Sequence, residues 1–150
     1  MNPSLYYFKP SEFNRAGVNW FSKTDSALLV RLDILRFRLG SPVVISPVDG
    51  ATGRENGTND KSQHNIEYHG IVRAADFFVP GVSASRVVNA MRALSFTGIG
   101  VYPEGLYDGK QETRYHGDVR TDRKPGDPAE WGYYGGEDTS IDKALERTVA

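Results

Sequence analysis

The sequence predicts an α+β domain in which helices pack on one face of a small, mostly antiparallel sheet. Two segments, 24–40 and 83–96, repeat apolar residues at helical spacing. Between and after them lie short apolar runs bounded by Gly, Pro and Asn, which are typical of strands. The chain has 150 residues and no domain-sized linker, so we expect one domain with a core over about 5–131 and a C-terminal tail at 132–150.

The strongest predicted helix is "TDSALLVRLDILRFRLG", at 24–40. Thr24 or Asp25 is suited to cap its first turn, and Gly40 is well placed to end it. Four leucines form its apolar stripe, with arginines elsewhere around the helix: Leu28, Leu32, Leu35 and Leu39. This pattern predicts an amphipathic helix packed on a core.

The remaining elements follow in order along the chain. "KPSEF" is a candidate helix start, and Ser83 is the expected cap of the second helix. The polar, Gly-rich segment from Pro47 to Asn65 is a long loop of the kind that tends to be functional or mobile. We predict strands in "PVVIS", "IVRAADFFV", "GIGVYP" and "ETRYHGDVR", a hairpin-like link in "EGLYDGKQ" and a last short helix in "SIDKALERTVA".

Composition excludes several classes of protein. Apolar residues make up 39% and charged residues 25%, which is ordinary for a globular chain. A net charge of -1 gives no electrostatic case for nucleic acid as a partner. No signal peptide and no apolar run long enough for membrane insertion are present, so we expect cytoplasmic synthesis. The chain has no cysteine, so a metal would need His, Asp or Glu ligands.

Three residues are candidate metal ligands: His69, Asp76 and His116. A catalytic zinc ion takes three protein ligands and keeps one position open for water, and two histidines with a carboxylate form such a set. Asp76 lies in an otherwise apolar strand, where an isolated carboxylate is unfavourable unless it is paired or bound to a cation. Asp118 follows His116 at strand spacing, so it could orient that imidazole or touch a substrate. The alternative is that each histidine only stabilises the fold and binds no metal.

The chain resembles a known family in several segments that occur in family order. These are "YYFKPSEF", "LLVRLDILRFRLGSPVVIS", an arginine in a Gly-rich loop, "HGIVRAAD", "GIGVYP", "YHGDVR" and a later Trp. Together they resemble the zinc D-Ala-D-Ala carboxypeptidases, peptidoglycan peptidases related to hedgehog domains, and most of all their small phage-type branch. The resemblance implies a hedgehog/D-Ala-D-Ala peptidase-like fold and one Zn²⁺.

The family pattern Ser-x-His-x-x-Gly-x-Ala-x-Asp is best matched here by His69 and Asp76. Two positions depart from it, because Glu67 stands for the serine and Val72 for the glycine. "SQH" at Ser62 to His64 copies the start of the pattern, but the residue seven positions after His64 is isoleucine. We therefore predict His69 as the ligand and keep His64 as the lesser alternative.

The resemblance also implies roles for residues outside the ligand set. Arg54 best matches the loop arginine that grips a substrate carboxylate, a task that suits a bidentate guanidinium. Glu112 is the first candidate for the general base, because on a strand it would share a face with His116. Asp118, Glu67 and His64 are its rivals.

The expected function is a zinc-dependent peptidoglycan peptidase that hydrolyses stem-peptide bonds as a D,D-carboxypeptidase or an endopeptidase. It would reach the cell wall through a lysis system or in a virion. A second hypothesis is an inactive zinc-binding structural, virion or tail component of the same fold. A third is a metal-free ligand-binding domain in which His69 and His116 never meet. The bond cut, the wall type and the oligomeric state do not follow from the sequence.

Overall fold

The computed structural model describes residues 4–148, and it is α+β as predicted. The helices are α1 (Ser26–Leu39), α2 (Ile66–His69), α3 (Ala84–Ala93) and α4 (Ile141–Glu146), with 3-10 turns η1 (Pro10–Phe13) and η2 (Phe21–Lys23). The strands are β1 (Val44–Ile45), β2 (Ala74–Phe78), β3 (Gly98–Tyr102), β4 (Leu106–Tyr107), β5 (Lys110–Gln111), β6 (Arg114–Asp118), β7 (Ala129–Tyr134) and β8 (Glu137–Thr139).

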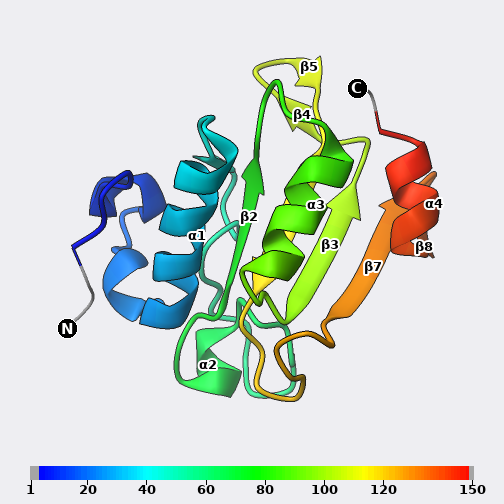
Figure 1. Cartoon of the computed structure of the whole chain (residues 1–150). Helices are drawn as coiled ribbons and strands as arrows, with labels where there is room; N and C mark the ends of the chain where they lie inside the picture. The colour runs from blue at the N-terminus through cyan, green and yellow to red at the C-terminus, as the bar shows by residue number, and fades with distance from the viewer. Residues whose placement is uncertain (1–3, 149–150) are drawn as a thin grey trace.

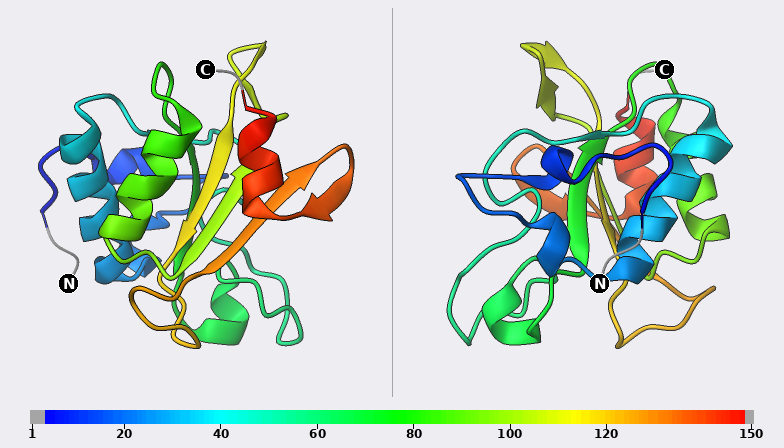
Figure 2. Two further views of the ribbon diagram at one scale, coloured as in Figure 1. Left: turned by 45° about the vertical axis from the view of Figure 1, so that its right-hand side comes forward. Right: turned by 90° about the vertical axis from the view of Figure 1, so that its left-hand side faces the viewer.

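Six strands form one open sheet in the order β1-β2-β6-β3-β7-β8, and β4 pairs with β5 in a separate hairpin. Every pairing in the large sheet is antiparallel except that of β3 with β7. Helices α1 and α3 lie side by side on one face of this sheet (Figure 1). The long loop before α2 runs on the other side, as the edge-on view shows (Figure 2).

Helix α1 forms for the reasons that its sequence indicates. The Asp25 side chain accepts a hydrogen bond from the Ala27 amide at 2.9 Å, which caps the first turn. Gly40 ends the helix with a φ of 63°, a left-handed conformation that glycine adopts without a steric penalty. The apolar stripe is fully inside, with Leu28 and Leu32 both at 0% exposure. The predicted helix and its apolar face are confirmed.

The side chains of the inner strand β6 alternate between the two faces of the sheet. Tyr115 points to the helix side and stacks on Phe77, with ring centroids 5.7 Å apart. Gly117 points the same way, and a Cβ atom there would come within 2.9 Å of the Phe96 ring. The alternate residues of the strand therefore face the opposite side, away from the helices.

The C-terminal residues 132–148 are not a tail outside the core, which corrects the expectation for this part of the chain; positions 149–150 lie outside the described residues. Strands β7 and β8 extend the sheet, and α4 packs against β7 and β3. Gly132 allows the close contact, because a Cβ atom there would overlap the side chain of Ala144. Ala144 and Ile141 belong to the same buried cluster as α1 and α3. The sequence indicates little of this, because the segment 121–139 is rich in Pro, Gly and charged residues and β8 carries no apolar residue.

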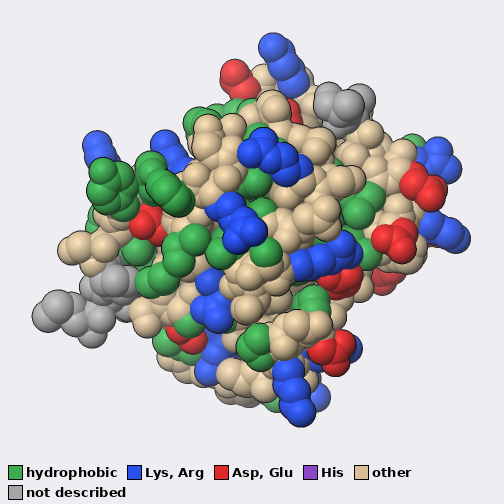
Figure 3. All heavy atoms as spheres, in the orientation of Figure 1, with side chains coloured by type: hydrophobic (Ala, Val, Ile, Leu, Met, Phe, Trp, Pro, Cys, Tyr) green, Lys and Arg blue, Asp and Glu red, His purple; other side chains and the backbone are tan. Residues whose placement is uncertain are grey.

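The surface seen from the helix side carries Lys and Arg side chains over several elements, and apolar side chains gather over α1 (Figure 3). The most exposed large apolar residues there are Tyr6 at 86% and Phe37 at 70%. Within the described residues no helix is long and apolar enough to span a membrane.

Candidate metal centre

The sheet register brings two of the expected ligands together. Asp76 of β2 and His116 of β6 are directly paired across the antiparallel ladder. Their side chains project from the face opposite the helices, and His116 Nδ1 lies 3.2 Å from Asp76 Oδ1. Both residues are only 8% exposed. Residues 40 positions apart in the chain thus meet because β6 pairs beside β2.

The third member of the group is His64, from the loop before α2. Its Nδ1 donates a hydrogen bond to the carbonyl oxygen of Thr52 at 2.6 Å, because a carbonyl can only accept. The backbone ties the same two segments together, since the Arg54 amide donates to the His64 carbonyl at 2.9 Å. His64 is 2% exposed, and its ring lies 5.1 Å from that of His116.

The prediction that His69 joins Asp76 and His116 is not supported by the structure, which places His64 there instead. One helical turn, α2, is inserted between His64 and strand β2, and it carries His69 at its far end. Asn65 caps this turn and Gly70 ends it with a φ of 75°. His69 Nε2 donates to the Lys61 carbonyl at 3.0 Å, so that nitrogen already has a partner. The structure therefore brings His64, the lesser alternative from the sequence, together with Asp76 and His116.

The geometry of His64, Asp76 and His116 suits a single metal ion. One ligand atom from each lies within 4.8 Å of the other two. His64 Nε2 lies 3.3 Å from Asp76 Oδ1, yet it is buried without a hydrogen-bond partner among the described residues. A buried imidazole nitrogen in this state needs an explanation, and a bound cation supplies one. Two imidazoles and a carboxylate are also a donor set that zinc accepts. These residues therefore fit a catalytic metal.

The three side chains strongly perturb one another. Burial raises the pKa of Asp76, but the imidazoles of His116 and His64 outweigh it and hold that pKa well below its usual range. Burial lowers the pKa of His116, but its hydrogen bonds to Asp118 and Asp76 prevail and raise it to about 9. His116 is therefore a cation between two carboxylates at neutral pH, and a metal ion would replace the proton on Nδ1.

Asp118 lies behind His116 and orients it. Its Oδ2 accepts a hydrogen bond from His116 Nε2 at 2.6 Å, which leaves Nδ1 for the metal side. Arg120 donates to both oxygens of the same carboxylate, at 2.9 and 2.7 Å. Gly98 leaves the space for this carboxylate, because a Cβ atom there would overlap it. At 0% exposure Asp118 is closed to substrate. It matches the expected orienting role rather than that of a proton acceptor in the pocket.

Trp131 and Tyr102 complete the site, and the sequence analysis gave neither of them a role in the chemistry. The Trp131 ring lies 5.0 Å from that of His116, and its Nε1 donates to the Tyr102 hydroxyl at 2.9 Å. Gly100 makes room for the indole, because a Cβ atom there would lie 2.6 Å from Nε1. The alternation of Gly98, Gly100 and Tyr102 in "GIGVY" was the available signal, since all three share one face of β3.

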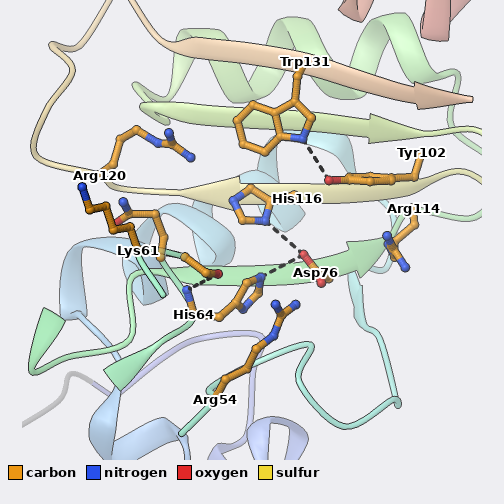
Figure 4. Close-up of a pocket in the computed structure, with 11 residues that line it drawn as sticks. Arg54, Lys61, His64, Asp76, Tyr102, Arg114, His116, Arg120 and Trp131 are labelled. Carbon is orange, nitrogen blue, oxygen red and sulfur yellow. Dashed lines mark hydrogen bonds and ion pairs between the residues drawn. The ribbon is translucent and has the colours of Figure 1, made fainter. Parts of the chain in front are cut away.

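A pocket of about 360 Å³ opens over the three grouped side chains (Figure 4). In the close-up, His64 and His116 both point toward Asp76, and Arg54 extends from the loop toward the same carboxylate. The pocket is lined by Arg54, Lys61, Ser62, Gln63, His64, Asp76, Tyr102, Arg114, His116, Arg120 and Trp131. Of the described residues in this lining, four are Lys or Arg and Asp76 is the one carboxylate. The pocket therefore favours an anionic ligand.

Of the two remaining candidates from the sequence, Arg54 lines the pocket and Glu112 does not. Arg54 lies in the pocket wall, where its Nε donates to the Gly50 carbonyl at 3.0 Å and no ion pair is formed within the described residues. This position fits the expected carboxylate grip. Glu112 lies between β5 and β6 and is not part of the pocket lining. Its assignment as general base has no geometric support here.

Comparison with known proteins agrees with this geometry. A family model described as Peptidase M15 matches residues 6–106, which is more than half of the chain, so the chain belongs to the Peptidase M15 family. This confirms the family predicted from the sequence, and the members of that family are metallopeptidases. The match includes Arg54, His64 and Asp76 and ends ten residues before His116. No curated protein and no solved structure was found to match the chain.

Proposed function

We propose that this chain is a zinc-dependent peptidoglycan peptidase that hydrolyses stem-peptide bonds, as a D,D-carboxypeptidase or an endopeptidase. The observation that carries the proposal is the convergence of His64, Asp76 and His116 at the base of a basic pocket. Membership of the Peptidase M15 family supports the peptidase chemistry. The resemblance to the D-Ala-D-Ala carboxypeptidases supports zinc as the metal and cell-wall peptides as the substrate.

In this proposal His64 Nε2, His116 Nδ1 and an Asp76 oxygen hold one zinc ion. When bound, zinc lowers the pKa of a water molecule toward about 7 and polarises a carbonyl group. The Thr52 carbonyl and Asp118 keep the two imidazoles in the tautomers that turn these nitrogens toward the centre. Asp118 is itself fixed by Arg120, so the ligand set is ordered before metal and substrate arrive.

Arg54 binds a carboxylate of the substrate beside the ligand group. Its guanidinium lies in the pocket wall without an ion pair in the described part of the chain, so it is available for a bidentate contact. The excess of cationic side chains in the pocket draws in a peptide that carries several carboxylates. Stem peptides of peptidoglycan have this chemistry, at the chain terminus and along the side chains.

The proposed place of action is the cell wall, reached through a lysis system or inside a virion. This part of the proposal rests on the resemblance to the small phage-type branch. The oligomeric state and the type of wall are left open.

The test is mass analysis of muropeptides after incubation with the zinc-loaded chain. We expect release of an amine product, loss of cleavage after chelation and recovery when zinc is returned. His64→Ala should abolish cleavage, and the matched variant His69→Ala, five residues away, should retain it. Cleavage that survives both chelation and His64→Ala would contradict the proposal.

One observation favours a second candidate, an inactive zinc-binding structural or virion component. Within the described pocket lining, no carboxylate other than Asp76 is available to accept a proton from the attacking water. A chain that binds one zinc ion through His64 yet releases no amine from muropeptides between about pH 5 and 9 would belong to this class.

A further inference from the structure

The pocket lining includes the phenolic hydroxyl group of Tyr102, a neutral donor. Tyr102 belongs to β3, the strand that pairs with the His116 strand β6. It ends strand β3, and its neighbour Gly100 is directly paired with His116. Tyr102, Gly100 and Gly98 lie on the same face of β3, and the two glycines leave the space that Trp131 and Asp118 occupy. In the close-up the Tyr102 hydroxyl points toward Trp131, above His116 and Asp76 (Figure 4).

The hydrogen bond from Trp131 fixes the role of this hydroxyl. An indole Nε1 can only donate, so the Tyr102 oxygen is the acceptor in the 2.9 Å contact. Among the described residues, no hydrogen bond accepts the phenolic proton in return. A phenol has an ordinary pKa of about 10, so this proton stays in place at neutral pH. Acceptance of one hydrogen bond also strengthens the next donation in a chain.

The ring of Tyr102 is held as firmly as its hydroxyl. The Arg114 guanidinium lies 4.4 Å from the ring centroid, a cation–π contact that clamps one side. The donor is therefore fixed before a substrate arrives, which is the condition for stabilising charge that develops during a reaction.

We propose that the Tyr102 hydroxyl donates a hydrogen bond to the oxyanion that forms from the scissile carbonyl during peptide hydrolysis. This inference rests on the proposed function. Water adds through oxygen to the carbonyl carbon, and the carbonyl π electrons move to the carbonyl oxygen, to which Tyr102 donates. Tyr102 keeps its proton throughout. When the C–N bond breaks, its electron pair leaves with the amine, which takes a proton that came from the water.

The positive lining explains why a neutral donor is useful here. Arg54 is committed to a substrate carboxylate, and Arg120 is committed to Asp118. Tyr102 supplies a directed donor without adding another charge. Trp131 acts through Tyr102, so it is a positioning residue for this hydroxyl and also packs beside His116.

The experiment compares Tyr102→Phe with the wild-type chain and with Tyr133→Phe, all zinc-loaded, on muropeptides. Loss of one oxyanion donor should lower kcat about 100-fold. KM and the affinity for the product peptide should stay within about threefold, because the contact forms only as charge develops. Tyr133 is 40% exposed and does not line the pocket, so Tyr133→Phe should match the wild type.

A binding measurement provides a readout other than turnover. A phosphinate analogue of the scissile peptide bond carries a tetrahedral anion, so Tyr102→Phe should weaken its affinity by about the same factor as kcat. Zinc content and thermal unfolding should be unchanged. The role of Tyr102 would be overturned if Tyr102→Phe kept the wild-type kcat, or if it lost affinity for the phosphinate and for the product equally. Neither outcome would affect the proposed function. An inactive wild-type chain would instead overturn the proposed function on which it rests.

Discussion

The two faces of strand β6 differ in the residues that they carry: the helix side is packed with apolar rings, and the pocket side carries charged groups. The helix side carries Tyr115 and Gly117, packed against apolar rings under α3. The pocket side carries Arg114, His116 and Asp118. His116 and Asp118 are hydrogen-bonded to each other, and the Arg114 guanidinium lies over the Tyr102 ring. Alternation along one strand therefore separates residues that stabilise the fold from residues that can carry chemistry.

The two faces contribute differently to the free energy of folding. Burial of apolar side chains on the helix side is favourable, whereas buried ionised groups are tolerated only when they are paired. Asp118 meets this condition with one imidazole and one guanidinium. A variant on the helix side should therefore affect stability alone, whereas a variant on the pocket side should affect metal binding as well.

The largest expected effect is on metal binding by His64→Ala. Loss of a ligand should weaken zinc affinity by more than the roughly 100-fold that loss of an outer hydrogen-bond partner causes. Calorimetric titration of the metal-free chain with zinc measures this. His69→Ala is the matched control and should bind zinc as the wild type does. A result in which only His69→Ala lost zinc would restore the original sequence interpretation and break the comparison.

A change on the helix side should act on stability instead. Leu32 is fully buried under the sheet, and Leu32→Ala should lower the free energy of unfolding by about 2–5 kcal/mol. Denaturant unfolding of the metal-free chain measures the loss, and zinc titration of the folded variant should give the wild-type affinity. If zinc affinity fell together with stability, the two faces would not be separable in the way described.

Asp118→Asn should have an intermediate effect, confined to the pocket side. The amide keeps the shape but weakens the hydrogen bond that orients His116, so zinc affinity should fall about 10- to 100-fold. Titration with zinc measures it, and cleavage should fall in step. An unchanged zinc affinity would show that the ring of His116 is held by packing alone.

The smallest expected effect is the pH dependence of stability without metal. His116 has a folded pKa raised from 6.5 to about 9, so its contribution is complete below pH 6.5 and is lost as the pH rises through 9. The lowered pKa values of Asp76 and Asp118 make their contributions complete above about 3.8 and lost in acid.

Stability of the metal-free chain should therefore be greatest between about pH 4 and 6.5 and should fall by up to about 1.4 kcal/mol per unit between pH 7 and 8. Denaturant midpoints at a series of pH values measure this. His116→Gln removes the titrating group, and its stability should be flat over pH 7–8. A wild-type profile equally flat over that range would contradict the assignment of His116 as a buried cation.

The sequence predicted the helix side of the fold better than the pocket side. Apolar periodicity located α1, because the spacing of Leu28 and Leu32 reports which face is buried. The β7–β8 hairpin was not predicted, because the sequence around it is rich in Gly and charged residues. In the structure it is held by the pairing of β7 with β3 and by the contact with α4.

Two of the three grouped residues, Asp76 and His116, were expected from strand position and residue type. The third was assigned to His69 because spacing was counted along an uninterrupted chain. Because the turn α2 lies between His64 and β2, the histidine that meets Asp76 is five residues before His69, in the "SQH" segment. Chain spacing alone cannot reveal how this turn folds, whereas the sheet register and the contact of His64 with the Thr52 carbonyl place His64 beside Asp76.

The most direct test of the central claim is a crystal structure of the chain with zinc, located by anomalous scattering at the zinc edge. We predict one ion bound by His64 Nε2, His116 Nδ1 and an Asp76 oxygen, with ligand distances near 2.0–2.2 Å. An ion at His69, or no ion within reach of these three side chains at saturating zinc, would contradict the account.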